Sequence, residues 1–202
     1  MTETITDNND WTNIKVAQYI PKRAELISQS EKLQFLDKLL EIKNNYIDDE
    51  NIDNEIQFKE FKISELFNIL KTPDIEYKED KYVHNISAKN NNNGVKNIIK
   101  SNKKTFYGNK IVLITGGDGG AGLAFYQKSD FNISSATVVL SPKKTLKLNE
   151  KVGIYLSLIL SNYKLKYSRG FQWNTERILN DIMYLPITDD NQINYDFINT
   201  YF

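Results

Sequence analysis

The glycine-rich segment Thr115-Gly-Gly-Asp-Gly-Gly-Ala-Gly122 matches the G-x-G-x-x-G spacing of dinucleotide-binding loops at Gly117, Gly119 and Gly122. In such loops the glycines lead directly into a helix, whose free backbone N–H groups bind the pyrophosphate. Here they lead into Leu-Ala-Phe-Tyr-Gln, which is a strand sequence, and no acidic residue for a ribose hydroxyl follows about 20 residues later. We therefore expect no nucleotide cofactor, and we interpret the glycines as serving either a tight hairpin or the close approach of backbone to a partner.

The other common kinds of active site also lack their residues. His84 is the only histidine, and the absence of cysteine excludes thiolate nucleophiles and thiolate metal ligands. No G-x-S-x-G nucleophile motif is present, and no Walker lysine follows the glycines. We therefore expect no catalytic residue, no metal site and no cofactor, in a protein that is not an enzyme.

The charged residues are divided unevenly along a chain whose net charge is zero. Residues 81–177 carry 16 Lys and Arg against four Asp and Glu, whereas residues 1–80 carry 10 basic and 18 acidic side chains. Residues 178–202 carry four Asp and no basic residue. A basic middle section indicates a surface that binds a polyanion, and the alternative is a solvated lysine-rich surface of the kind that AT-rich genomes encode.

Within the basic section, lysines alternate with aromatic rings and amides in two stretches, Lys100–Tyr107 and Lys164–Trp173. Ammonium groups bind phosphates, whereas Arg pairs with guanine and Asn or Gln with adenine. Trp173 could stack on a base, but we expect it in the core because large aromatic side chains are usually buried. The predicted phosphate contacts are Lys89, Lys103, Lys104, Lys164 and Lys166, and the predicted base contacts are Ser168, Arg169 and Gln172, with Asn92 as a secondary candidate.

The acidic N-terminal part is predicted to contain one long amphipathic helix, from Ala24 to Ile47. Its apolar residues form a narrow stripe on an otherwise charged surface, which favours packing against one partner helix, as in a coiled coil, or against its own domain. The stripe consists of Leu26, Leu33, Leu36, Leu40 and Ile47. Residues 1–52 are thus interpreted as an acidic lead-in plus a helix for oligomerisation or partner docking.

Residues 53–202 are predicted to form one α+β domain, with a small mixed β-sheet and packed helices. Strands are expected at 81–88, 110–115, 123–127 and 136–140, with an Asn-rich turn at 90–94. A short strand near Phe61 should lead into a helical turn capped by Ser64. Helices are expected at 150–162, at 174–184 with Pro186 as the stop, and at 194–202.

Nothing in the sequence predicts a membrane location. The N-terminus, MTETITDNND, is acidic and polar, unlike a signal or transit peptide. The longest apolar run, Val152–Leu160, is too short to span a bilayer. We expect a cytoplasmic protein.

The order of motifs from Phe58 to Phe202 resembles the target recognition domain of specificity (S) subunits in Type I and related Type IIB/IIG restriction–modification systems. The resemblance depends on the order and spacing of many short segments. Among them are Phe61–Phe67, Ile86–Lys89, Gly108–Thr115, Ala124–Gln127, Lys166–Gly170, Ile182–Pro186 and Tyr195–Ile198.

This resemblance implies a non-catalytic subunit that reads a sequence in double-stranded DNA. It would direct an adenine methyltransferase (M) subunit and, where one exists, a nuclease subunit. Only one recognition domain is present, so the chain could be a half-subunit that forms a homodimer through Leu26–Ile47, a truncated copy or a derived regulator. The alternatives are a protein-interaction module whose basic face binds an acidic partner, and an NAD-dependent reductase.

Overall fold

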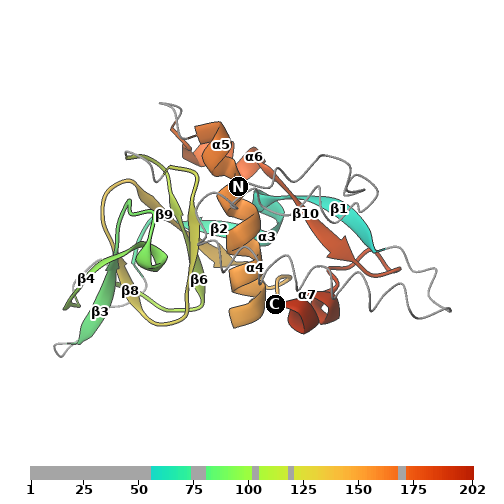
Figure 1. Cartoon of the computed structure of the whole chain (residues 1–202), viewed down its shortest axis with the longest axis horizontal. Helices are drawn as coiled ribbons and strands as arrows, with labels where there is room; N and C mark the ends of the chain where they lie inside the picture. The colour runs from blue at the N-terminus through green and yellow to red at the C-terminus, as the bar shows by residue number, and fades with distance from the viewer. Residues whose placement is uncertain (1–55, 74–80, 102–104, 118–120, 168–171) are drawn as a thin grey trace, which may run out of the picture.

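The computed structural model describes residues 56–73, 81–101, 105–117, 121–167 and 172–202 (Figure 1). The predicted helix Ala24–Ile47 lies outside these residues, and so do Lys103, Lys104, Ser168 and Arg169. The described strands are β1 Gln57–Lys62, β2 Phe67–Leu70, β3 Tyr82–Ile86, β4 Val95–Lys100, β5 Thr105–Phe106, β6 Lys110–Ile114, β7 Ala124–Gln127, β8 Phe131–Ile133, β9 Thr137–Pro142 and β10 Ile182–Ile187. The described helices are α3 Ile63–Leu66, α4 Glu150–Leu160, α5 Lys164–Tyr167, α6 Thr175–Asn180 and α7 Tyr195–Tyr201, with 3₁₀ turns η3 Asn92–Gly94 and η4 Ser161–Tyr163.

The strands of the described part form three sheets. One is antiparallel with the order β2-β9-β6-β7, and a second has the order β4-β3-β8-β5, in which β3 and β8 run parallel. The third is the antiparallel pair β1-β10. The predicted α+β class with a mixed sheet is therefore confirmed, although the strands are divided among several sheets.

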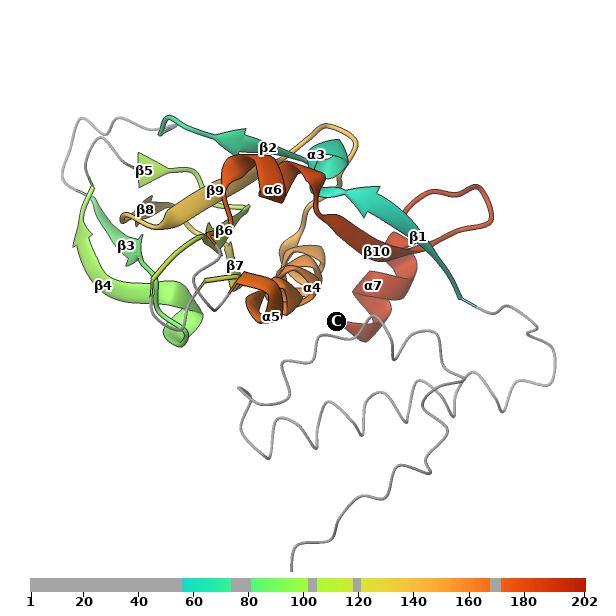
Figure 2. The ribbon, with the colours of Figure 1, turned by 90° about the horizontal axis from the view of Figure 1, so that it is seen from above.

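The sheet β2-β9-β6-β7 is covered on both faces, which explains why β6 is apolar at almost every position. Ile111 and Leu113 face the large core cluster that includes α4, whereas Val112 packs with Phe106 and Phe131 of the mixed sheet. Successive side chains of a strand point to opposite faces, so a strand buried on both sides needs a continuous apolar run. Figures 1 and 2 show α4 beside this sheet, with β3 and β4 on its far side.

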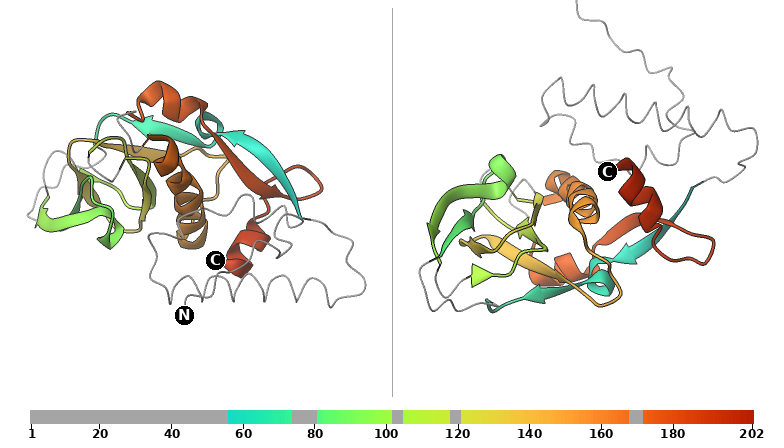
Figure 3. Two further views of the ribbon diagram at one scale, coloured as in Figure 1. Left: turned by 45° about the horizontal axis from the view of Figure 1, so that its top comes forward. Right: turned by 90° about the horizontal axis from the view of Figure 1, so that it is seen from below.

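Helix α4 begins where the sequence places it. The side chain of Asn149 accepts a hydrogen bond from the backbone N–H of Val152 at 2.9 Å, which satisfies a free donor of the first turn. Gly153 allows the helix to lie close to β7, because a Cβ there would be 2.2 Å from Cδ2 of Tyr126. The opposite side of α4 packs on α7 (Figure 3). There the rings of Tyr155 and Phe202 meet edge to face, with their centroids 4.7 Å apart.

The prediction of a helix from 174 to about 184 is wrong beyond Asn180. The helix begins as expected, with Asn174 accepting from the backbone N–H of Arg177 at 2.9 Å, but Asp181 is extended and Ile182–Ile187 is strand β10. This strand pairs with β1 in the register Phe61 to Met183. Met183 and Leu185 enter the core from it, so a distant partner strand outweighs the local helical preference.

Of the other local predictions, some are confirmed and some are wrong. The strands at 81–88, 110–115, 123–127 and 136–140 are confirmed within one to three residues at each end, and the Asn-rich turn has positive φ at Asn92, Asn93 and Gly94. Ser64 does not cap α3: the helix begins at Ile63, and Glu65 accepts from the backbone N–H of Lys62 at 2.7 Å. Strand β4, which is an exposed edge, was not predicted.

None of the helices in the described residues combines the length and the apolar character that crossing a bilayer requires. Nor do three His, Asp or Glu side chains of this part gather closely enough to hold a metal ion.

Candidate nucleic-acid interface

The described residues of the glycine-rich segment, 115–117 and 121–122, follow β6 and precede β7, which pair as an antiparallel hairpin. The backbone N–H of Gly122 donates to the carbonyl of Ile114 at 2.8 Å, and Ile114 donates in return to Leu123 at 2.8 Å. Gly122 has φ +87°, a conformation that glycine adopts without strain. A Cβ at this position would lie 2.4 Å from the backbone N and Cα of Lys164, so this glycine lets the hairpin touch the start of α5.

Two further turns meet the same hairpin. The backbone N–H of Thr115 donates to the carbonyl of Ala136 at 2.9 Å, and a Cβ on Gly117 would lie 2.9 Å from Cβ of Ala88. Residues 87–89, 115–117, 121–122, 134–136 and 163–164 therefore lie together at one end of the domain, and we call them the loop face. The β6–β7 hairpin thus meets the end of β3, the turn between β8 and β9 and the start of α5, which are far apart in the sequence.

The structure brings Lys89 and Lys164 to the loop face and places Gln172 next to it. Lys89 and Lys164 are half-buried and Gln172 is exposed. Gln172 is linked to the face through its neighbour, since the backbone N–H of Trp173 donates to the carbonyl of Thr115 at 3.2 Å. Asn92 is exposed on η3, in the turn that follows Lys89, where Asn93 donates to the carbonyl of Tyr126 at 2.9 Å.

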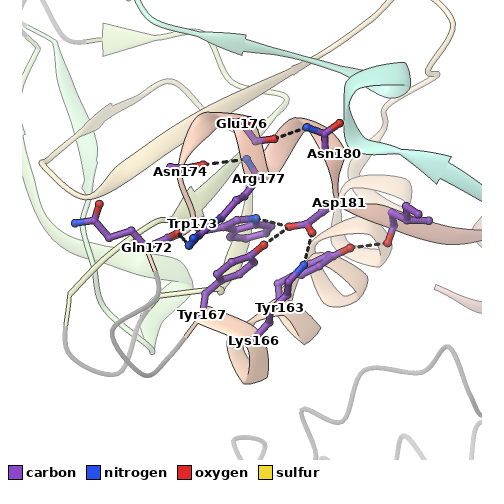
Figure 4. A network of polar contacts seen from close by, with 11 residues as sticks. Tyr163, Lys166, Tyr167, Gln172, Trp173, Asn174, Glu176, Arg177, Asn180 and Asp181 are labelled. Atoms are coloured by element: carbon purple, nitrogen blue, oxygen red, sulfur yellow. Dashed lines mark hydrogen bonds and ion pairs between the residues drawn. The ribbon is translucent and has the colours of Figure 1, made fainter.

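Beside the loop face lies a polar cluster centred on a buried carboxylate (Figure 4). Asp181, at 7 % exposure, accepts hydrogen bonds from the hydroxyl of Tyr167 at 2.8 Å and from Nε1 of Trp173 at 2.7 Å, both through Oδ2. Its Oδ1 accepts from Nζ of Lys166 at 2.7 Å. Tyr163 completes the cluster by donating to the carbonyl of Ile182 at 2.7 Å. We call these residues the Asp181 cluster.

The aromatic rings of the cluster are stacked. The ring centroids of Tyr167 and Trp173 are 5.3 Å apart with 16° between the planes, and those of Tyr163 and Trp173 are 5.0 Å apart. Trp173 is completely buried, which confirms the expectation that it belongs to the core. Its indole N–H has the partner that a buried tryptophan needs.

Lys166 has an internal anionic partner that the sequence does not reveal. The hydrogen bond to Asp181 raises the pKa of its ammonium, and that ammonium also lies 5.2 Å from the ring centroid of Tyr167. Burial raises the pKa of Tyr167, and its hydrogen bond to Asp181 adds to the shift. The positive charge of Lys166 is therefore largely balanced within the protein, unlike that of a lysine that faces only solvent.

Sequence reasoning missed Asp181 and Tyr167 as members of a site. The only available signal was a single acidic residue between a helix cap and an apolar run, Asn180-Asp-Ile-Met. Arg177 was expected on a helix, but its Nη1 also donates to the carbonyl of Gln172 at 2.8 Å. An open groove between α5 and α6 is lined by Lys166, Tyr167, Asn174, Glu176, Arg177, Asn180 and Asp181.

The family of DNA specificity domains of Type I restriction–modification systems matches residues 55–202, which include the described loop face and the Asp181 cluster. The chain belongs to this family. The resemblance noted in the sequence is thereby confirmed, and membership assigns the chain a role in DNA sequence specificity.

A curated relative agrees with this membership. The chain is 25 % identical over 177 residues to the Type II restriction enzyme BgcI specificity subunit S.BcgI of Heyndrickxia coagulans. The match covers 85 % of this chain and 50 % of the relative, so the chain spans about half the length of the protein it matches.

Two solved structures share the fold. The HsdS subunit from Thermoanaerobacter tengcongensis has a TM-score of 0.51 at 11 % identity, covering 88 % of this chain and 46 % of that one. A structure that concerns the complex assembly and conformational transition of the type I R-M system has a TM-score of 0.51 at 10 % identity, covering 89 % of this chain and 47 % of that one. At these identities the likeness concerns the fold alone.

Proposed function

We propose that this chain is a sequence-specific, double-stranded DNA-binding specificity subunit, or half of one, that directs an adenine methyltransferase and a nuclease to its site. The match of the DNA specificity domain family to residues 55–202 carries the proposal. The loop face also supports it, since the backbone of Lys89 and of Lys164 belongs to that face and Trp173, next to the exposed Gln172, is hydrogen-bonded to it. Ammonium groups next to an amide can bind a phosphate backbone and read a base edge.

The proposed interface assigns a separate task to each kind of side chain. Lys89 and Lys164, with Lys103 and Lys104 from outside the described residues, bind phosphates and make the affinity salt-dependent. Gln172, together with Ser168, Arg169 and the secondary candidate Asn92, contacts base edges. Lys166 was predicted to bind a phosphate as well, and its side chain is exposed; we propose that its ion pair with Asp181 takes up its charge instead.

The proposal extends to the N-terminal part and to the partners. The helix Ala24–Ile47, through its leucine stripe, docks the M subunit or a second copy of this chain as a coiled coil. A homodimer would place two recognition domains on one DNA. The partner subunits, which carry methylation and cleavage, act with this chain in the cytoplasm.

Selection from a library of random-sequence duplexes on the purified chain, at about 150 mM salt, tests the proposal, because nonspecific phosphate binding is weak at that salt concentration. We expect enrichment of one short motif, and we expect Gln172→Ala to relax the preference at one position of it. The matched control is Lys143→Ala, because Nζ of Lys143 donates to the carbonyl of Ser64 within the protein. This variant should enrich the same motif as wild type.

Two results would contradict the proposal. Salt-sensitive binding without an enriched motif, also after addition of the M subunit, would mean that the basic face attracts polyanions without reading them. Complete absence of DNA binding would favour the protein-interaction module with an acidic partner.

A further inference from the structure

We propose that the Asp181 carboxylate is a positioning residue for base readout, holding the backbone from which Gln172 projects. This inference rests on the proposed function, since it concerns how the proposed reader is kept in place. Asp181 itself lies under the surface and would not touch DNA.

The first observation is that one carboxylate holds the chain on both sides of Gln172. Tyr167 precedes it by five residues and Trp173 follows it directly, and both donate to the same oxygen, Oδ2, at 2.8 and 2.7 Å. Their stacked rings add a second contact between the two positions. Tyr167 and Trp173, on the two sides of Gln172, are therefore attached to the same carboxylate oxygen.

The second observation concerns the peptide group between Gln172 and Trp173. Its carbonyl oxygen accepts from Nη1 of Arg177 at 2.8 Å, and its N–H donates to the carbonyl of Thr115 at 3.2 Å. With both polar atoms bonded to different elements, this peptide plane has little freedom to rotate. In Figure 4 the amide of Gln172 points away from the cluster, so a fixed backbone carries a free, outward side chain.

The third observation is that Asp181 is itself fixed by the fold. Its backbone N–H donates to the carbonyl of Arg177 at 2.9 Å, and its carbonyl accepts from the N–H of Ile63 at 2.9 Å. The carboxylate thus sits where α6, β10 and α3 meet. A rigid attachment of this kind fixes the backbone position from which a reading side chain reaches a base edge, which leaves only its own rotamers to be ordered on binding.

Stability alone gives a weaker reason for this arrangement. Burying a carboxylate costs free energy that its partners must offset, and a well-packed apolar replacement is often as stable. In addition, the three donors to Asp181 fix one relative position of Lys166, Tyr167 and Trp173. We therefore expect the cluster to matter more for discrimination between sequences than for nonspecific affinity.

Tyr167→Phe and Trp173→Phe test the inference in the full-length chain, because each removes one donor to Oδ2 and keeps a ring for the stack. The matched control is Tyr126→Phe, which removes a hydroxyl that donates to Asn109 at 3.0 Å from another largely buried tyrosine. The measured quantities are the melting temperature and the ratio of dissociation constants for a random duplex and for the selected duplex.

We expect the ratio to fall about tenfold in Tyr167→Phe and Trp173→Phe, the size of losing one base-pair contact. Affinity for the random duplex and its salt dependence should stay unchanged. Tyr126→Phe should lower the melting temperature to a similar degree and keep the ratio. Asp181→Asn should lower the ratio at least as much. If that variant does not fold, Tyr167→Phe and Trp173→Phe still test the inference.

The inference is overturned if all three Phe variants lose stability alike and keep the wild-type ratio, because the cluster would then serve only the core. That result leaves the proposed function intact. A wild-type chain that prefers no sequence overturns the proposed function first and this inference with it, so the two failures are distinguishable.

Discussion

Replacement of Gly122 by Ala tests the contact that assembles the loop face. Gly122 has φ +87°, where an L side chain is strained by about 1–2 kcal/mol. The added Cβ would also lie 2.4 Å from backbone atoms of Lys164, which cannot move without displacing α5. A smaller gain, about 0.4–1 kcal/mol, comes from the stiffer unfolded chain. The net expected loss is about 3 kcal/mol in the free energy of unfolding, once the displacement is included.

The measurement is thermal and urea unfolding followed by circular dichroism. For a domain of this size a loss of 1 kcal/mol lowers the melting temperature by roughly 2–4 °C, so Gly122→Ala should melt about 6–12 °C lower than wild type. Gly116→Ala is the matched control in the same hairpin. Its Cβ would lie 3.6 Å from Cβ of Ala136, an ordinary contact, and we expect a change of less than about 1 kcal/mol.

Equal melting temperatures for the two variants would refute the reasoning. They would mean that the hairpin and the start of α5 do not touch in solution, and the loop face would lose the contact that joins Lys164 to it. A loss in Gly122→Ala accompanied by weaker DNA binding at constant temperature would agree with a loop face that depends on this contact.

Charged, titrating and capping residues give three further predictions. Lys89→Ala and Lys164→Ala should each reduce the slope of log affinity against log salt by about 0.9, whereas Lys166→Ala should leave it unchanged, as salt titrations of duplex binding would reveal. The pKa of Lys166 is raised from 10.5 by its bond to Asp181, and that of Tyr167 from 10.0 mainly by burial. The stability that both protonated groups contribute is therefore fully present below about pH 10 and is lost as the pH rises through their pKa values in the folded protein. Urea unfolding between pH 8 and 11 should thus show a smaller decrease in the free energy of unfolding for Tyr167→Phe than for wild type. Asn149→Ala should cost about 1 kcal/mol by removing the cap of α4, and Asn149→Asp, which keeps the acceptor oxygen, should restore most of it in the same assay.

Elements that depend on local chemistry could be predicted from the sequence. The apolar run of β6 needs two covered faces and has them, and Asn149, Asn174 and Asn194 each accept from the backbone N–H three residues on. Similarly, Asn92 and Asn93 tolerate the positive φ of the turn before β4. For the caps and the turn the determining partner is within a few residues, and for β6 the apolar run itself indicates a strand covered on both faces.

Elements with distant partners were not predictable in this way. The segment Ile182–Ile187 follows a capped helix, and its own sequence has no pattern that indicates a strand. It is a strand because it pairs with β1. The candidate site shows the same limit. Lys89, Lys164 and Lys166 are predicted as phosphate contacts for the same reason, their charge, and nothing in the local pattern shows that Lys166 meets Asp181, fifteen residues away.

The pairing of β1 with β10 has a consequence for synthesis of the protein. Contacts such as that between Glu60 and Tyr184 join positions 124 residues apart. At about 5–20 residues per second, the ribosome needs roughly 6–25 s to make the partner after β1 has been made. During that time β1 keeps an open edge, while α4 and the strands between can already assemble. The first strand of the described residues is thus paired only after residues 182–187 have been made, and until then a nascent chain exposes a chaperone-accessible edge.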